Sequence, residues 1–231
     1  GDPVHTGDGR TWGSHGVRQS PQQTGMTFVE GTGCQVGAVS RMLSQKLTLR
    51  DSNRLPRRGH KVDLGLIYAG GLLAGDVDTM TFTGSGTKHW SLPFDTILTA
   101  RGSFAVVDSH GGDDNLPIFE RQFLGGARDL RGFQFRDIGP RDATGPNATQ
   151  EVLGGATSVF GSLEFTFPVI GQVRGAVFYD AGFVNSDSWD FNTGRLASDV
   201  GIGVRLNLPG IGPLAVDFAV PVETPDDQAD D

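Results

Sequence analysis

The feature that most constrains the fold is a two-residue periodicity in the C-terminal half of the chain. In residues 159–167, apolar or glycine residues at odd positions alternate with polar residues such as Ser162 and Glu164. The same alternation returns in three later segments, residues 173–180, 199–208 and 214–220. Because successive side chains of a strand point to opposite faces, all four segments are predicted to be strands with one apolar face and one small or charged face.

Weaker alternation upstream predicts four further strands, for a total of about eight. They lie at residues 40–51, 61–68, 80–90 and 96–107. We therefore divide the chain into three regions: a loop region (1–38), an antiparallel sheet (39–222) and an acidic tail (223–231). The loop region contains at most a ragged strand, near residues 26–29. A very long connection, residues 109–156, separates the two groups of strands.

The predicted strands favour a transmembrane β-barrel over a soluble sandwich. Mean hydropathy is only −0.21, and the apolar stretch at residues 64–75 is far shorter than the ~20 residues of a spanning helix. A barrel needs only every second residue to face lipid, and the turns alternate between short and long, as they do in outer-membrane barrels. Periodicity alone does not say which face meets lipid, but five charged residues lie on the less apolar faces and suit a wet interior: Arg174, Asp180, Asp199, Arg205 and Asp217.

The long connection carries a motif that points to a family. It contains Gly125-Gly126-Ala127-Arg128-Asp129-Leu130-Arg131-Gly132-Phe133, and it is followed by Gly161-Ser162-Leu163-Glu164-Phe165 and by Phe178-Tyr179-Asp180-Ala181-Gly182. Over roughly residues 50–222 the chain resembles the C-terminal barrel of the BamA (bacterial surface antigen) outer-membrane assembly superfamily. That family carries a Gly-Gly…Arg-Gly-aromatic motif in a loop that folds back into the barrel lumen.

The resemblance implies a role for each residue of the motif. Arg131 should cross the lumen to Glu164 and Asp180 on the barrel wall, Gly132 should allow a tight turn and Phe133 should pack against the wall. The flanking glycines, Gly125 and Gly126, belong to the same motif. The period-two count independently places both acids on the charged faces of their strands, and a buried guanidinium needs such partners. The alternative is that Arg131 is an ordinary surface charge.

The function implied by the resemblance is protein assembly at the bacterial outer membrane, without enzymatic chemistry. The expected partners are outer-membrane lipid, unfolded β-barrel client proteins inserted through a lateral seam, and accessory lipoproteins or upstream periplasmic repeat domains. Family barrels have sixteen strands and end on an aromatic residue, whereas this chain has about eight predicted strands and stops at an acidic tail. We therefore expect this chain to be the C-terminal half of such a barrel, lacking its final strand. Two alternatives stay open: a two-partner secretion or translocation-assembly transporter of the same superfamily, or a small structural surface barrel.

Other chemistry finds little support in the sequence. A net charge of −8 argues against nucleic acid as a partner. The single cysteine, Cys34, and the five histidines lack the spacing of metal ligands. No dinucleotide fingerprint and no nucleophile elbow occurs. We therefore expect no cofactor, no metal and no catalytic residue.

Overall fold

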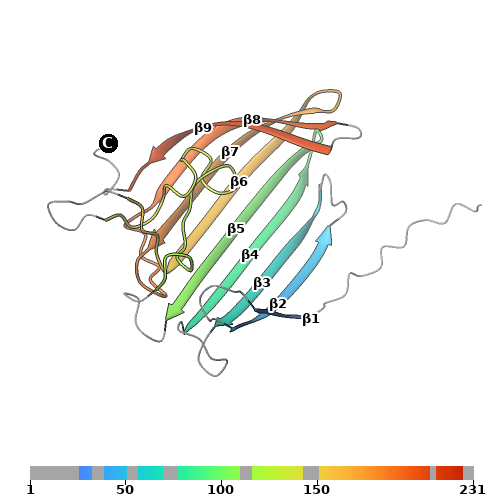
Figure 1. Ribbon diagram of the computed structural model, residues 1–231. Helices are drawn as coiled ribbons and strands as arrows, with labels where there is room; N and C mark the ends of the chain where they lie inside the picture. The colour runs from blue at the N-terminus through green and yellow to red at the C-terminus, as the bar shows by residue number, and fades with distance from the viewer. Residues whose placement is uncertain are drawn as a thin grey trace, which may run out of the picture.

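The described strands form one antiparallel sheet in which each strand pairs with its neighbour in sequence. The computed structural model describes residues 26–32, 39–50, 57–69, 78–109, 116–142, 151–208 and 212–225. The strands are β1 (Met26–Thr32), β2 (Val39–Arg50), β3 (Gly59–Ala69), β4 (Thr79–Leu92), β5 (Thr96–Ser109), β6 (Thr157–Ile170), β7 (Val173–Asn185), β8 (Ala197–Leu208) and β9 (Gly212–Glu223). Their order in the sheet is their order in the chain (Figure 1). The predicted all-β antiparallel fold class is confirmed.

The strand count differs from the prediction, because nine strands lie in the described residues where the periodicity predicted about eight. The additional strand is β1, which pairs with β2 from Met26 opposite Gln45 to Thr32 opposite Val39. Its sequence includes Glu30 and a glycine, so its facial contrast is weak. Backbone hydrogen bonds to β2 hold this segment as a strand, although its side chains do not alternate clearly between apolar and polar. The sheet therefore begins inside the region predicted as loop or ragged strand.

The two faces of the sheet are the reverse of those in a soluble protein. On one face apolar side chains are exposed, with Leu163 at 52%, Ile202 at 62% and Phe218 at 69% of their full accessibility. On the other face the carboxylates Asp180 and Asp199 are fully buried. We call the first the outer face and the second the inner face. An apolar outer face of this kind is what a barrel presents to lipid.

The two ends of the sheet are β1 and β9, and within the described residues these strands do not pair with each other. The segment between β5 and β6 does not follow the sheet. Its described parts, residues 116–142 and 151–156, form what we call the inner loop, which lies against the β6–β9 half of the sheet (Figure 1). In the described part of the chain, no helix has the length and apolar character needed to cross a membrane.

Candidate functional site on the inner face

The inner loop contains a compact excursion whose base is closed by two backbone hydrogen bonds and shaped by two glycines. Leu124 and Ile138 exchange two backbone hydrogen bonds of 3.1 and 3.0 Å. Gly125 and Gly126 follow immediately with φ of 109° and 104°, a region that side chains with a Cβ rarely adopt. A Cβ on Gly125 would also overlap the carbonyl oxygen of Gln134. The glycine pair therefore lets residues 125–137 form a compact excursion that projects from the rest of the loop.

An apolar cluster holds this excursion against the sheet. Its members come from the loop and from three neighbouring strands: Leu124, Leu130 and Ile138 from the loop, Phe160 from β6, Val184 from β7 and Ala197 from β8. Leu130 is fully buried, and Phe133 packs against the cluster from its edge. Burying an aliphatic side chain of this size contributes about 1.5–3 kcal/mol. Packing therefore fixes Leu130, which precedes Arg131, and Phe133, two residues beyond it, and this sets the direction of the Arg131 side chain.

Arg131 extends from the loop into a group of carboxylates contributed by the sheet. Its Nε and Nη2 donate to the two carboxylate oxygens of Asp180 on β7, at 2.7 and 3.0 Å. Its Nη1 donates to Glu164 Oε2 on β6 at 2.8 Å. The Arg131 side chain is only 6% exposed, and that of Asp180 is fully buried. The pairing with Asp180 is the bidentate geometry in which a guanidinium binds a carboxylate most strongly.

The surroundings of the Arg131 guanidinium stabilise its charge. Its central carbon lies 3.4 Å from the ring centroid of Phe178, a cation–π arrangement, and Nη2 also approaches Ser162 Oγ at 3.4 Å. Burial lowers the pKa of Arg131, but the hydrogen bonds that it donates to Asp180 and Glu164 outweigh this effect and raise the pKa above its ordinary value. The guanidinium is therefore a permanent positive charge in this position.

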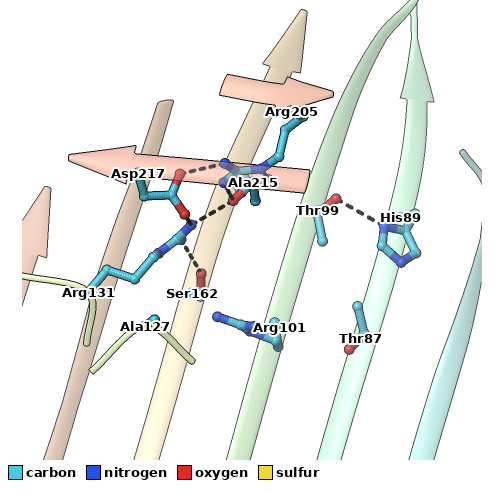
Figure 2. A pocket seen from close by; sticks show the side chains of 11 residues that line it. Thr87, His89, Thr99, Arg101, Ala127, Arg131, Ser162, Arg205, Ala215 and Asp217 are labelled. Atoms are coloured by element: carbon cyan, nitrogen blue, oxygen red, sulfur yellow. Dashed lines mark hydrogen bonds and ion pairs between the residues drawn. The ribbon is translucent and has the colours of Figure 1, made fainter. Parts of the chain in front are cut away.

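A second arginine and a third carboxylate complete the site. Arg205 on β8 donates from Nη2 and Nε to the two oxygens of Glu164, at 2.6 and 3.2 Å. Its Nη1 donates to Asp217 on β9, and the other oxygen of Asp217 accepts from Arg131 Nη1 at 3.3 Å. Figure 2 shows Arg131 reaching from the loop toward Asp217 and Arg205. We call Arg131, Arg205, Glu164, Asp180 and Asp217 the arginine cluster.

Gly132 makes a separate contact next to the arginine cluster. Its backbone N–H donates to Asp199 Oδ2 on β8 at 3.0 Å, and Asp199 is itself fully buried. A Cβ at position 132 would lie 2.6 Å from the Asp199 Cβ and 3.2 Å from the backbone nitrogen of Pro221 on β9. Only glycine leaves room for this approach of the loop backbone to the sheet.

The structure brings Arg131 together with Glu164 and Asp180, the two acids named from the sequence. It places Gly125 and Gly126 at the base of the excursion, and Phe133 beside the apolar cluster. Sequence reasoning did not name Arg205, Asp217 or Asp199 as partners of the loop. The signal was present in part, since all three lie on the charged faces of strands with clear alternation.

Metal binding gains no support from the described residues, which hold no group of three or more His, Cys, Asp or Glu side chains able to surround an ion. The carboxylates of the arginine cluster are bound by guanidinium groups instead.

A sheet with an apolar outer face, a charged inner face and a loop folded against that inner face has the arrangement of a membrane β-barrel wall. The chain belongs to the Omp85 superfamily, whose domain matches residues 42–231. This membership agrees with the prediction that the chain is not an enzyme.

Similar proteins come from bacteria and from an animal. The chain is 29% identical over 177 residues to outer membrane protein assembly factor BamA of Nitratidesulfovibrio vulgaris, which covers 75% of this chain and 22% of that protein. It is 27% identical to a SAM50-like protein of Drosophila melanogaster, over 77% of this chain and 39% of that protein. Its fold matches the crystal structure of BamA from Haemophilus ducreyi lacking POTRA domains 1-3, with a TM-score of 0.71 and 22% identity over 82% of this chain and 40% of that chain. The chain thus spans less than half the length of these relatives.

Proposed function

We propose that this chain is the C-terminal part of a sixteen-stranded outer-membrane barrel that inserts β-barrel client proteins into the membrane. The observation that carries the proposal is the arginine cluster, in which one loop arginine contacts carboxylates of three different strands. Membership of the Omp85 superfamily and likeness to a protein named as an outer-membrane assembly factor support the same function.

In this proposal Arg131, with Glu164 and Asp180, locks the inner loop in the lumen. A barrel that opens along one seam loses backbone hydrogen bonds there and needs another source of rigidity. The guanidinium supplies it, because withdrawing the loop would leave the fully buried carboxylate of Asp180 without its counter-charge, at a cost of several kcal/mol. Gly125, Gly126, Gly132 and Phe133 act by shaping and seating the loop.

The mechanism that we propose is physical rather than chemical. A seam that opens laterally offers unpaired backbone groups to a strand of the client, a form of β-augmentation. The client then grows its own sheet from that edge while the lock preserves the shape of the lumen. No cofactor takes part. The partners in this scheme are unfolded β-barrel clients, membrane lipid against the outer face, and accessory lipoproteins or periplasmic repeat domains upstream.

We place the protein in the bacterial outer membrane. The likeness to a bacterial assembly factor at 29% identity favours this over the outer membrane of an organelle, for which the Drosophila relative is the point of comparison. The exposed apolar side chains of the outer face, such as Leu163 and Ile202, suit either bilayer.

The proposal is tested with the protein at its full natural length, reconstituted in liposomes of bacterial lipid. An unfolded β-barrel client is added, and its folding is followed by gel mobility without heating and by protease protection. We expect the protein to accelerate client folding and Arg131→Ala to lose most of that acceleration. Arg128→Ala is the matched control, since Arg128 is an exposed arginine of the same loop.

Two results would count against insertion, and a third would count against the lock. Client folding at the same rate in empty and protein-containing liposomes would exclude insertion. Passage of a soluble polypeptide across the bilayer, without client insertion, would instead favour a secretion transporter. Equal activity of the Arg128→Ala and Arg131→Ala proteins would exclude the lock while leaving insertion itself in place.

A further inference from the structure

From the contacts of Asp217 and Gly132, we infer that the inner loop also controls the pairing of β9 with β8, and that Arg205 and Asp217 are the positioning residues that transmit this control. The inference rests on the proposed lock and extends it from holding the loop to holding the end strand of the described sheet. Within the described residues β9 pairs only with β8, so any contact from the loop adds to the attachment of β9.

The first of these contacts is Asp217, which lies near the middle of β9. Its carboxylate accepts from Arg131 of the loop at 3.3 Å and from Arg205 of β8. The side chains of Arg205 and Asp217 are only 17% and 21% exposed, so water screens the interaction incompletely. Asp217 therefore ties β9 to both the neighbouring strand and the loop.

A glycine on β8 makes room for this arrangement. Gly203 is the residue directly opposite Asp217 in the ladder. A Cβ at Gly203 would overlap the Asp217 carboxylate and lie 2.7 Å from Arg205 Nη1. The missing side chain of Gly203 thus leaves room on the inner face for the ion pair between Arg205 and Asp217. Arg205 also donates a hydrogen bond to Glu164 on β6.

The second contact lies where the β8–β9 ladder is irregular. Its register shifts between Ser198 and Asp199, so that Asp199 is opposite Pro221. Proline has no N–H to donate to a ladder, and a shift of this kind leaves one residue unpaired. The loop approaches at this point, where Gly132 donates to Asp199 and lies close to the backbone nitrogen of Pro221. The loop therefore lies at the irregular part of the β8–β9 ladder.

These two contacts predict a coupled equilibrium. When the loop is seated, Arg131 forms an ion pair with Asp217 of β9, and Gly132 covers the irregular part of the ladder at Asp199 and Pro221. When the loop withdraws, β9 loses both contacts. Linkage requires the converse, so loosening β9 must weaken the seating of the loop by the same factor. Arg205 and Asp217 act here by positioning, and contact with a client is not required for their effect.

The test is hydrogen–deuterium exchange of the full-length protein in detergent micelles, without any client. We expect Asp217→Asn and Arg131→Ala each to raise exchange in the β9 peptides at least about tenfold, which corresponds to about 1.4 kcal/mol. The double variant should exceed the larger single effect only slightly, because both changes break one network. Exchange in β4 and β5 should stay unchanged. Asp63→Asn is the matched control, since Asp63 forms an ion pair of similar exposure with Lys61 inside β3.

A disulfide across the two strands tests the route of the effect. Val204 and Val216 are opposite one another in the ladder and both lie on the outer face. In a Cys34→Ser background, oxidised Val204→Cys/Val216→Cys should suppress the rise in β9 exchange caused by Arg131→Ala. Gel mobility without heating confirms that each variant is folded, and Arg131→Lys replaces Arg131→Ala if the latter is not.

The inference is overturned if exchange in β9 stays at the wild-type rate in the Arg131 and Asp217 variants while exchange in the loop peptides rises. That outcome leaves the proposed insertion function standing, because no client enters the measurement. Conversely, faster β9 exchange in an Arg131→Ala protein that still inserts clients would support the inference and refute the functional role of the lock.

Discussion

Replacing Arg131 tests the physical basis of the lock directly, and the structure sets the size of the effect. In Arg131→Met the bulk of the side chain is largely kept, but the positive charge is lost. Glu164 and Asp217 remain bound by Arg205, so neither of these carboxylates becomes isolated. Asp180, which is fully buried and gives both of its oxygens to Arg131, is left without its guanidinium.

The expected loss of stability is therefore that of one uncompensated buried charge, about 3–5 kcal/mol. The measurement is equilibrium urea unfolding of the full-length protein in detergent micelles, followed by tryptophan fluorescence. Arg128→Met on the exposed part of the same loop should stay within about 0.5 kcal/mol of the wild type.

A second substitution separates the buried charge from other effects. Adding Asp180→Asn to Arg131→Met replaces the unpaired carboxylate with a neutral amide, whose burial without a partner costs about 1–3 kcal/mol instead. The double variant should thus be more stable than Arg131→Met by about 2 kcal/mol, the difference between the midpoints of these two ranges. A loss below about 1 kcal/mol in Arg131→Met, or no recovery in the double variant, would refute the reasoning.

Three further predictions concern the seat of the loop, the outer face and the effect of pH. Gly132→Ala should cost about 1–3 kcal/mol in urea unfolding because its Cβ has no space, whereas Gly161→Ala, whose Cβ would have no neighbour closer than 4.0 Å, should be nearly neutral. Leu163→Arg on the outer face should weaken folding into lipid vesicles by about 2–4 kcal/mol, and Phe119→Arg on the exposed inner loop should not. Burial raises the pKa of Asp129 above its ordinary 3.8, against the opposing charges of nearby arginines. The folded state therefore binds this proton more tightly, and stability should rise as pH falls through the raised pKa toward 3.8. The urea midpoint of Asp129→Asn should lack this part of the pH dependence, and an identical pH profile in both proteins would contradict it.

Much of the sheet could be predicted because apolar and polar residues alternate within β6, β7 and β8. This alternation shows which side chains of each strand share a face. Ser162, Glu164 and Thr166 share one side of β6 by spacing alone, and the structure buries that side. β1 was predicted only as a ragged strand, because its place depends on hydrogen bonds to β2 that leave no side-chain pattern. The motif around Arg131 was recognised through its resemblance to the loop motif of a known family.

The remaining partners of the loop could not be predicted, for two physical reasons. Asp217 meets Arg131 only because of how β9 is aligned with β8, an alignment that places Asp217 opposite Gly203. No spacing within one strand encodes the alignment between two strands. The bond from Gly132 to Asp199 uses a backbone N–H, a donor that every residue except proline carries, so its residue type gives no signal.

Leu130 and Arg131 hold the loop against the sheet by different contacts, and a final prediction follows from this difference. Leu130 packs with residues of β6, β7 and β8 in the apolar cluster, while its neighbour Arg131 contacts charged side chains of β6, β7 and β9. Two adjacent residues cannot leave the sheet independently, so the apolar and ionic contacts should break together.

Leu130→Ala should therefore open the same segment as Arg131→Met, although it removes no charge. The substitution should cost about 2–5 kcal/mol, as expected for a buried leucine, and hydrogen–deuterium exchange should rise together across residues 125–137 in both variants. Ile118→Ala is the control, because Ile118 is 61% exposed on the same loop. If exchange rose only next to the substituted residue, the loop would not open as one unit. The ionic contacts would then have to hold Arg131 without help from the packing beside it.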